Sequence, residues 1–363
     1  MKDDEIAKNQ LTARTMLTEL HNLVASASTE EDFAKLRGVA QDADIFVDLA
    51  RLWQDESLEK AIGAYQTAVS IASDESEDKP VDYRAIRLSS NLGTLYQLQG
   101  NVETAERMYQ EALSKVASEE GNDAETIKTI LAYNLARAYE EEGDIPKATQ
   151  WYRDVLRQHP EHMESKVRLA MIAAAAGRNF DAHTLLKECL KADETNITLR
   201  SVYTNFLISI GSHKEALVFT SQTLKYDRYD AATFASLGWL HFALGREAKL
   251  SQELAGRTKE YLRSAEAYQR ALDLDPKSAV AAQGLAIALA EDTLSIALSA
   301  VGSDEVKTRM RLAGQALTIF SRIADSLPSG AVNVNIGHCY FARGEEEKAI
   351  QAVRYMQIGR GFC

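Results

Sequence analysis

Proline, cysteine and long apolar runs are all scarce in this 363-residue sequence. Only five prolines occur, so few positions force a helix to break. Cys189, Cys339 and Cys363 are an odd number without the spacing of a metal site, and we expect a reduced, intracellular chain. The most apolar stretch, 280–290, is much shorter than the ~20 residues that span a bilayer. The first residues are charged and start no signal peptide, so we expect no membrane contact.

Recognised catalytic motifs are also missing. The sequence holds no HExxH, P-loop, GxSxG or CxxC motif and no glycine-rich dinucleotide loop. His159 and His162 are three residues apart, but Pro160 lies between them and no cluster of cysteines or carboxylates completes a ligand set. We therefore expect no enzyme activity, no catalytic residue, no metal site and no cofactor.

Positive charge is in deficit. The chain has 41 Lys and Arg against 53 Asp and Glu, a formal net charge of −12. Binding along a phosphate backbone needs a cationic face. We accordingly expect no nucleic acid among the partners.

Helix-forming residues dominate what remains. Ala, Leu, Glu, Lys, Gln and Arg are abundant, and alternating runs of β-branched residues bounded by turns are almost absent. This composition predicts an all-α protein.

A repeat with a period of 34 residues organises the helices. Leu135, Leu169, Tyr203 and Leu237 are successive equivalents, each followed by a small residue or threonine. The predicted turns between paired helices fall eight residues later, at Gly143, Gly177, Gly211 and Gly245. Leu-Gly or Leu-Ala, then Tyr, Gly, Ala, an aromatic residue and Pro at these spacings are typical of the tetratricopeptide repeat. We predict a right-handed superhelix, an α-solenoid of about eight helical hairpins.

The repeat frame also predicts how the chain is divided. We expect N-terminal helices over 1–41 and tetratricopeptide repeats over 42–245. An insertion within a repeat follows at 246–262, further repeats at 263–291, a second insertion at 292–312 and the final repeats at 313–352. An irregular tail over 353–363 leaves the last hairpin incomplete.

Binding residues are predicted on the first helix of each hairpin. Asn91 and Asn134 precede the Leu-Gly or Leu-Ala pair in adjacent repeats, where an amide can hydrogen-bond the backbone of an extended peptide. A hydrogen bond to the neighbouring repeat is an equal alternative for both. Arg137 and Arg168 lie on the same face in successive repeats and could meet acidic side chains of a partner.

Two neighbouring features complete the predicted surface. Met171 starts an apolar patch, 171–176, that could receive a partner helix. The acidic run 140–142 at the end of a helix is interpreted as a solvated face.

Several segments carry a more specific resemblance. These are 133–137 followed by Tyr152 and His159-Pro160, then 281–291, then 334–340. In this order they resemble the tetratricopeptide-repeat subunit of the RNA polymerase II-associated factor complex, in its fungal form. That family is longer, so the resemblance implies an internal fragment or a truncated gene model.

The function that the resemblance implies is a non-catalytic nuclear scaffold. It would support transcription elongation and co-transcriptional histone modification. Its partners would be the other subunits of that complex, as extended or helical segments, and RNA polymerase II directly or indirectly.

Two alternatives stay open at this stage. One is a generic tetratricopeptide-repeat adaptor, and the other is the repeat arm of a larger enzyme such as a glycosyltransferase. A continuous ladder of asparagines would favour the enzyme arm. The positions equivalent to Asn134 in later repeats hold Arg168, Val202, Ser236 and Gly284, which breaks the ladder.

Overall fold

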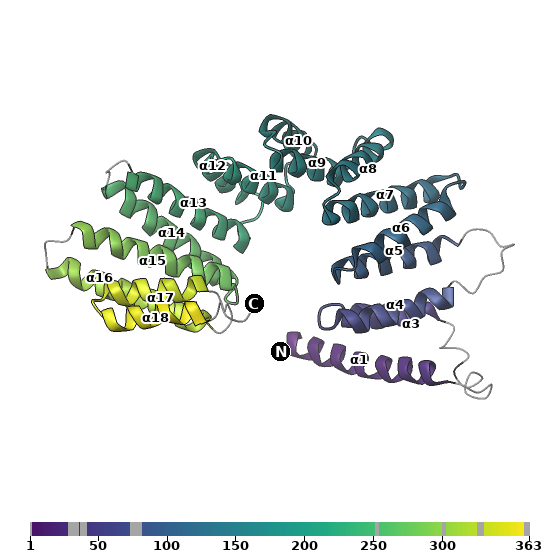
Figure 1. The fold of residues 1–363 in the computed structure, drawn as a ribbon, viewed down its shortest axis with the longest axis horizontal. Helices are drawn as coiled ribbons and strands as arrows, with labels where there is room; N and C mark the ends of the chain where they lie inside the picture. The colour runs from purple at the N-terminus through teal and green to yellow at the C-terminus, as the bar shows by residue number, and fades with distance from the viewer. Residues whose placement is uncertain are drawn as a thin grey trace. The chain divides into compact units, whose positions relative to one another are not determined.

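The computed structural model describes residues 2–27, 36, 42–72, 82–250, 254–299, 303–324 and 330–358, and all regular structure within these ranges is helical. The helices are grouped in two compact units, 1–185 and 186–363 (Figure 1). The boundary falls inside one helix, and each unit is described by itself.

The first unit is a stack of antiparallel helix pairs. Its helices are α1 (Lys2–Ser26), α3 (Ala43–Trp53), α4 (Leu58–Ala72), α5 (Tyr83–Leu98), α6 (Val102–Val116), α7 (Asn122–Glu142), α8 (Ile145–Gln158), α9 (Met163–Ala175) and α10 (Asn179–Ala192), the last of which crosses the boundary. Helix α3 packs on α4, α5 on α6 and α7 on α8. The first helices of consecutive hairpins, α5 and α7, also contact each other.

The second unit continues the same arrangement. It holds α11 (Ile197–Ser209), α12 (His213–Thr223), α13 (Ala231–Leu250), α14 (Leu254–Leu274), α15 (Ala279–Ser299), α16 (Ser303–Ile323), α17 (Gly330–Ala342) and α18 (Glu346–Ile358). Consecutive odd- and even-numbered helices pair, and the first helices α13, α15 and α17 contact their neighbours. In the described part of the chain α3 to α18 make eight hairpins, so the predicted all-α array of tetratricopeptide-type hairpins is confirmed.

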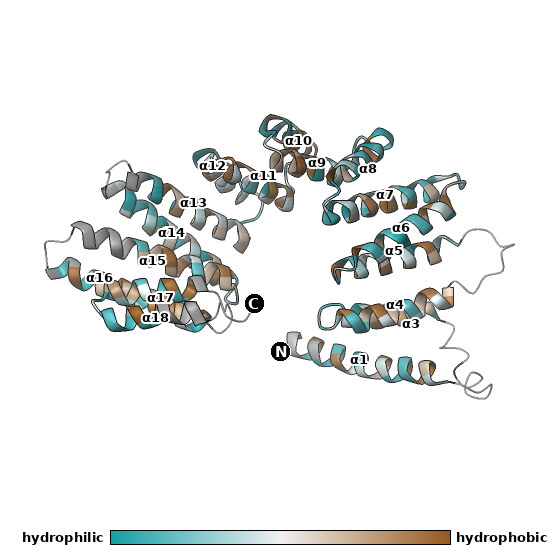
Figure 2. Cartoon of the chain, in the orientation of Figure 1, coloured by the Kyte–Doolittle hydropathy of each residue, from teal (hydrophilic) through white to brown (hydrophobic). Residues whose placement is uncertain are grey.

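Small and aromatic residues build the interior between hairpins. Ala136 and Ala148 are completely buried where α7 crosses α8, and Tyr109 and Tyr152 fill the adjoining space. A methyl group added at Gly93 would lie 2.8 Å from Cε1 of Tyr109, closer than packed carbon atoms approach. Apolar and polar residues alternate along the helices of both units (Figure 2), as expected for helices that are buried on one side only.

Glycine turns end the first helix of several hairpins. Gly143 lies at φ 85° in the left-handed region at the end of α7, and Gly177 and Gly211 have the same conformation. These three predicted turns are confirmed. The turn predicted at Gly245 is wrong, because α13 continues through this residue to Leu250. Gly245 serves packing instead, since a methyl group there would lie 2.7 Å from Cε1 of Tyr261.

The segments predicted as insertions are largely helical. Residues 246–250 extend α13, and 254–262 form the start of α14. Residues 292–299 extend α15, and 303–312 start α16. The paired helices are therefore 20 or 21 residues long, against 13 and 11 for α11 and α12.

The two ends of the chain are only partly described. Helix α1 occupies most of the predicted N-terminal segment, while 28–35 and 37–41 lie outside the described residues. The tail expected to be irregular from residue 353 is helical as far as Ile358, and 359–363 lie outside the described residues. No helix in the described ranges is both long enough and apolar enough to cross a bilayer.

Candidate partner-binding surface

The predicted asparagines lie on the first helices of adjacent hairpins. Asn91 on α5 is exposed. Asn134 on α7 is half-buried, and its Nδ2 donates a hydrogen bond to Oγ of Ser90 at 3.3 Å. Ser90 is itself buried on α5. The alternative interpretation, a bond between neighbouring repeats, thus holds for Asn134 in this structure, while Asn91 faces solvent.

Arg137 and Arg168 converge on one carboxylate. Nε of Arg168 lies 3.0 Å from Oε2 of Glu140, and its Nη2 contacts Oε1 of the same side chain. Nη1 of Arg137 lies 3.5 Å from Oε2 of Glu140, and Nη2 is 2.9 Å from Oε1 of Glu141. The two arginines expected to meet a partner's acidic residues are therefore already engaged by acidic residues of α7.

Glu140 is the centre of this cluster and corrects an expectation. The run 140–142, which the sequence predicts to be a solvated face, is exposed at Glu141 and Glu142. The side chain of Glu140 is only 14% exposed. The hydroxyl of the buried Tyr152 donates to Oε2 of Glu140 at 2.8 Å. Glu140 therefore links the first helix α7 to its own second helix and to α9.

Burial and charge shift the titration of the groups around Glu140. Burial raises the pKa of Tyr152, and the hydrogen bond to the Glu140 carboxylate raises it further. Burial alone would lower the pKa of Arg168, but the hydrogen bond and charge of Glu140 raise it above its ordinary value. Burial also raises the pKa of Tyr133, which packs against Tyr152 with ring centroids 5.8 Å apart.

Met171 lies at the edge of the same cluster. It is 43% exposed, and its Sδ is 3.5 Å from Nη1 of Arg168. The predicted apolar patch 171–176 is smaller than expected, because Ile172 and Ala173 are buried in the core. Met171, together with the exposed Ala175 and Ala176, remains available as apolar surface.

A flexible, exposed methionine next to a fixed arginine–carboxylate network suits contact with a partner side chain. Nδ1 of His162 accepts a hydrogen bond from the backbone N–H of Ser165 at 3.2 Å and so caps α9. Within the described ranges no group of three His, Cys, Asp or Glu side chains is placed to hold a metal ion.

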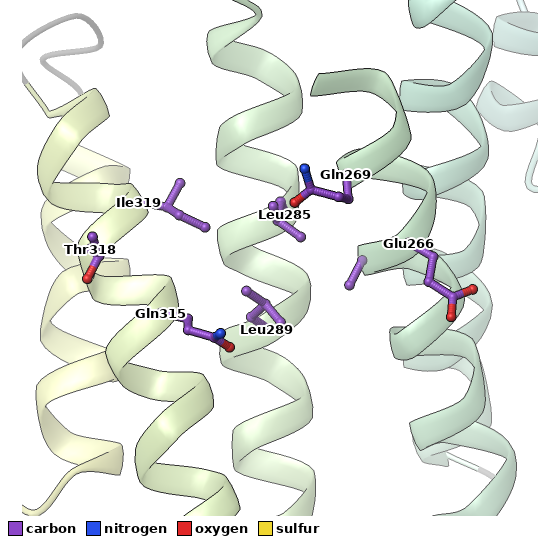
Figure 3. Close-up of a pocket in the computed structure, with 8 residues that line it drawn as sticks. Glu266, Gln269, Leu285, Leu289, Gln315, Thr318 and Ile319 are labelled. Carbon is purple, nitrogen blue, oxygen red and sulfur yellow. The ribbon is translucent and has the colours of Figure 1, made fainter. Parts of the chain in front are cut away.

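A groove recurs between successive second helices, over the first helix that separates them. The α14–α16 groove, of about 530 Å³, lies in the second unit and is lined by Ala265, Glu266, Gln269, Leu285, Leu289, Gln315, Thr318 and Ile319. Figure 3 shows Leu285 and Leu289 of α15 between Gln269 on one side and Ile319 on the other. The pattern of the repeat could have predicted these grooves, because their residues recur at equivalent places in the hairpins.

Two further grooves have the same construction. The α8–α10 groove, in the first unit, is lined by Thr149, Arg153, Leu169, Ala173, Arg178, Phe180, Asp181, Thr184 and Leu185. The α10–α12 groove, in the second unit, is lined by Lys187, Leu190, Lys191, Glu194, Arg200, Tyr203, Glu215, Val218, Phe219 and Gln222. Members of the two sets are 34 residues apart, as Arg153 and Lys187 or Asp181 and Glu215 show.

Family models for the tetratricopeptide repeat match residues 84–161 and 130–196. These matches cover the hairpins that carry the Glu140 cluster. Among solved structures, that of IFIT1 with m7Gppp-AAAA is 14% identical at a TM-score of 0.50 and covers 94% of this chain and 73% of that one. This likeness concerns the fold alone.

Curated relatives are similar over much of the chain. The Tetratricopeptide repeat protein 1 of Schizosaccharomyces pombe is 26% identical over 98% of this chain and 31% of its own length. The RNA polymerase-associated protein CTR9 of Saccharomyces cerevisiae is 27% identical over 79% of this chain and 26% of its own length. The chain therefore spans between a quarter and a third of the length of these relatives.

Proposed function

We propose that this chain, a tetratricopeptide-repeat protein, is part of a non-catalytic scaffold of the RNA polymerase II-associated factor complex. The observation that carries the proposal is similarity, spread over 79% of the chain, to a yeast protein named as RNA polymerase-associated. An Arabidopsis thaliana homologue of the same protein is 25% identical over 84% of the chain. Similarity over this much of the chain extends through several hairpins, so it does not come from a single generic repeat.

The proposal places the chain in the nucleus, where it would hold other subunits of the complex and support transcription elongation and co-transcriptional histone modification. RNA polymerase II would be contacted directly or through those subunits. Stacked hairpins suit this role, because each adds exposed surface without changing the core of its neighbours.

The partner surface that we propose comprises Asn91, Asn134, Arg137, Arg168 and Met171. Their proximity across α5, α7 and α9 supports it, since Asn134 bonds to α5 and Arg168 to α7. The contacts with Glu140 restrict the side-chain conformations of both arginines. A partner can then bind them without the full entropic cost of ordering long side chains.

An alternative function is the repeat arm of a larger enzyme. The observation in its favour is the human Protein O-mannosyl-transferase TMTC2, 29% identical over 29% of this chain and 12% of its own length. This similarity extends over only 106 residues, the length of about three repeats. The scaffold proposal accounts for more of the chain.

Affinity purification tests the proposal. The tagged chain, added to a fungal nuclear extract, should recover subunits of the polymerase-associated complex. Replacing Asn91, Asn134 and Arg137 together with alanine should reduce that recovery, while circular dichroism shows unchanged helical content. The matched control replaces Arg157 and Gln158, exposed near the end of α8, with alanine.

The two parts of the proposal fail separately. If the unaltered chain recovers none of these subunits, membership of the complex is refuted. If the triple variant recovers as much as the control, the partners bind elsewhere on the chain.

A further inference from the structure

The α10–α12 groove contains a cation in an unusual environment. Arg200 is 3% exposed, and its guanidinium lies 4.2 Å from the centre of the Phe219 ring and 4.8 Å from that of Tyr226. The same position holds the half-buried Lys166 one repeat earlier and Phe234 one repeat later. The register therefore holds a cation in two successive repeats, and it is fully buried at Arg200.

Within the part of the chain that the structure describes, Arg200 donates its hydrogen bonds to neutral acceptors. Nε donates to Oγ1 of Thr223 at 2.9 Å, and Nη1 and Nη2 donate to the carbonyl oxygens of Glu194 and Phe219, each at 3.3 Å. The carboxylate of Glu194 accepts its hydrogen bond from the Tyr226 hydroxyl, at 2.7 Å. Among the described residues, therefore, no carboxylate bonds directly to this buried cation, and the charge of Glu194 acts on it through space.

Two further cations lie on the wall of the groove. Lys187 and Lys191 are one turn apart on the exposed side of α10, and neither makes an ion pair within the part of the chain that the structure describes. Glu215 lies on the opposite wall. Three cations and two carboxylates therefore line this groove, in a chain whose net charge is −12.

The equivalent grooves differ in how their charges are placed. The α8–α10 groove has two cations, the exposed Arg153 and Arg178, and Arg178 is 3.7 Å from Asp181 and so forms an ion pair within the lining. The α14–α16 groove has one charged lining residue, Glu266. Unpaired lysines over a buried arginine thus distinguish the α10–α12 groove from grooves of the same construction.

Apolar side chains complete the lining. Leu190, Tyr203 and Phe219 lie beside the cations, and Val218 is 61% exposed at the rim. The groove measures about 410 Å³, enough for one or two side chains. An occupant of matching chemistry combines an aliphatic side chain with carboxylates on either side of it.

We infer that the α10–α12 groove is a docking site for an acidic segment of a partner protein. The aliphatic side chain lies over Leu190, Val218 and Phe219, and the flanking carboxylates pair with Lys187 and Lys191. The inference rests on the proposed scaffold function for the class of ligand, a protein segment, and is independent of the complex to which that protein belongs.

A synthetic probe tests the groove directly. The probe is a fluorescein-labelled 12-residue peptide of alternating glutamate and leucine, and binding to the full chain is measured by fluorescence anisotropy. Replacing Lys187 and Lys191 with glutamate should weaken binding about tenfold, because two exposed ion pairs become repulsive. Binding should weaken as the salt concentration is raised. A probe with glutamine in place of glutamate should bind the unaltered chain no more tightly than the glutamate probe binds the Lys187 and Lys191 variant.

A charge-matched control isolates the groove from the overall charge of the chain. Replacing Lys214 and Lys225 with glutamate changes the net charge equally at exposed sites outside the groove, and should leave the affinity within twofold. Replacing Val218 with serine should weaken binding without changing any charge.

The inference is overturned if the unaltered chain does not bind the probe. Equal loss in the groove and control variants, or displacement of the probe by a uridine oligonucleotide, would also overturn it. The probe is independent of nuclear partners, so its result stands whether or not the complex assignment fails.

Discussion

Glu140 supports a sharp test of how the hairpins are joined. Replacing it with alanine removes the acceptor of the buried Tyr152 hydroxyl and the main anionic partner of Arg168. A hydrogen bond to a charged group contributes about 1.5–3 kcal/mol. The ion pair adds ~0.5–1 kcal/mol after discounting for solvent, because Arg168 is 23% exposed. We expect Glu140→Ala to destabilise the α7–α9 region by about 2–4 kcal/mol.

Hydrogen exchange measured by mass spectrometry is the suitable assay, because a repeat array can open locally and global melting need not be two-state. The exchange of peptides from α8 and α9 should accelerate, while that of α3 and α4 stays unchanged. Glu141→Ala is the matched control, since Glu141 is exposed and contacts Arg137 alone among the described ion pairs. It should cost less than about 1 kcal/mol.

A double-mutant cycle with Tyr152→Phe identifies the cause of the loss. Phenylalanine leaves no hydroxyl in need of an acceptor, so the cost of Glu140→Ala in that background should fall by about 1.5–3 kcal/mol. A coupling energy below ~0.5 kcal/mol would refute the reasoning, because residues that do not interact show additivity to that extent.

Three other predictions use different parts of the fold. Gly143→Ala should destabilise the chain by about 1 kcal/mol in urea unfolding, since the φ of Gly143 is 85°. Gly63→Ala, inside α4 with open space around it, should stabilise the chain by up to ~1 kcal/mol. A change of the same sign for both would contradict the different backbone roles given to these two glycines. Burial raises the pKa of the Cys339 thiol to about 12, so at pH 8, in a chain with Cys189 and Cys363 replaced by serine, it should resist 5,5′-dithiobis(2-nitrobenzoate) until urea unfolds the chain. Fast labelling of that folded variant would show that the Cys339 thiol is exposed. Burial raises the pKa of Tyr268 from 10.0 to about 12, so its contribution to stability, complete below pH 10, should be lost as the pH rises from 10 to 12. Unfolding followed by circular dichroism should show that the Tyr268→Phe variant loses less stability than the unaltered chain over this interval. Identical pH profiles would exclude ionisation of Tyr268 as the cause of the loss.

The repeat frame predicted much of the fold because its positions have simple physical demands. A crossing point needs a small residue, and a hairpin turn in the left-handed region favours glycine, so Ala136 and Gly143 were recognisable. Gly245 satisfies the same spacing, yet α13 runs through it. There the side chain of Tyr261 occupies the space that a larger residue would need, and sequence spacing does not distinguish this use of glycine from a turn.

The sequence predicted which helices carry the residues of the candidate surface, but not what their side chains contact. Asn134, Arg137 and Arg168 are indeed placed on neighbouring first helices, as the register implies. Whether Asn134 meets a ligand or Ser90 depends on a side-chain distance across two hairpins, and the register does not specify it. Glu140 was assigned to solvent because acidic runs at helix ends are usually exposed, a tendency that fails where a buried tyrosine offers a hydroxyl.

Departures from the repeat carry information that the repeat itself does not. Equivalent positions experience nearly the same backbone and neighbours, so each hairpin acts as a control for the next. Against that background, Arg200 is fully buried where the equivalent cation Lys166 is half-buried, and burial makes the charge costly unless a function or a compensating anion maintains it. Comparison along the 34-residue register shows a cation at Lys166 and Arg200 and an aromatic ring at Phe234, and the sequence does not show which of the two cations is buried. The structure adds what the register lacks, namely the unpaired Lys187 and Lys191 beside it and the apolar groove that they border.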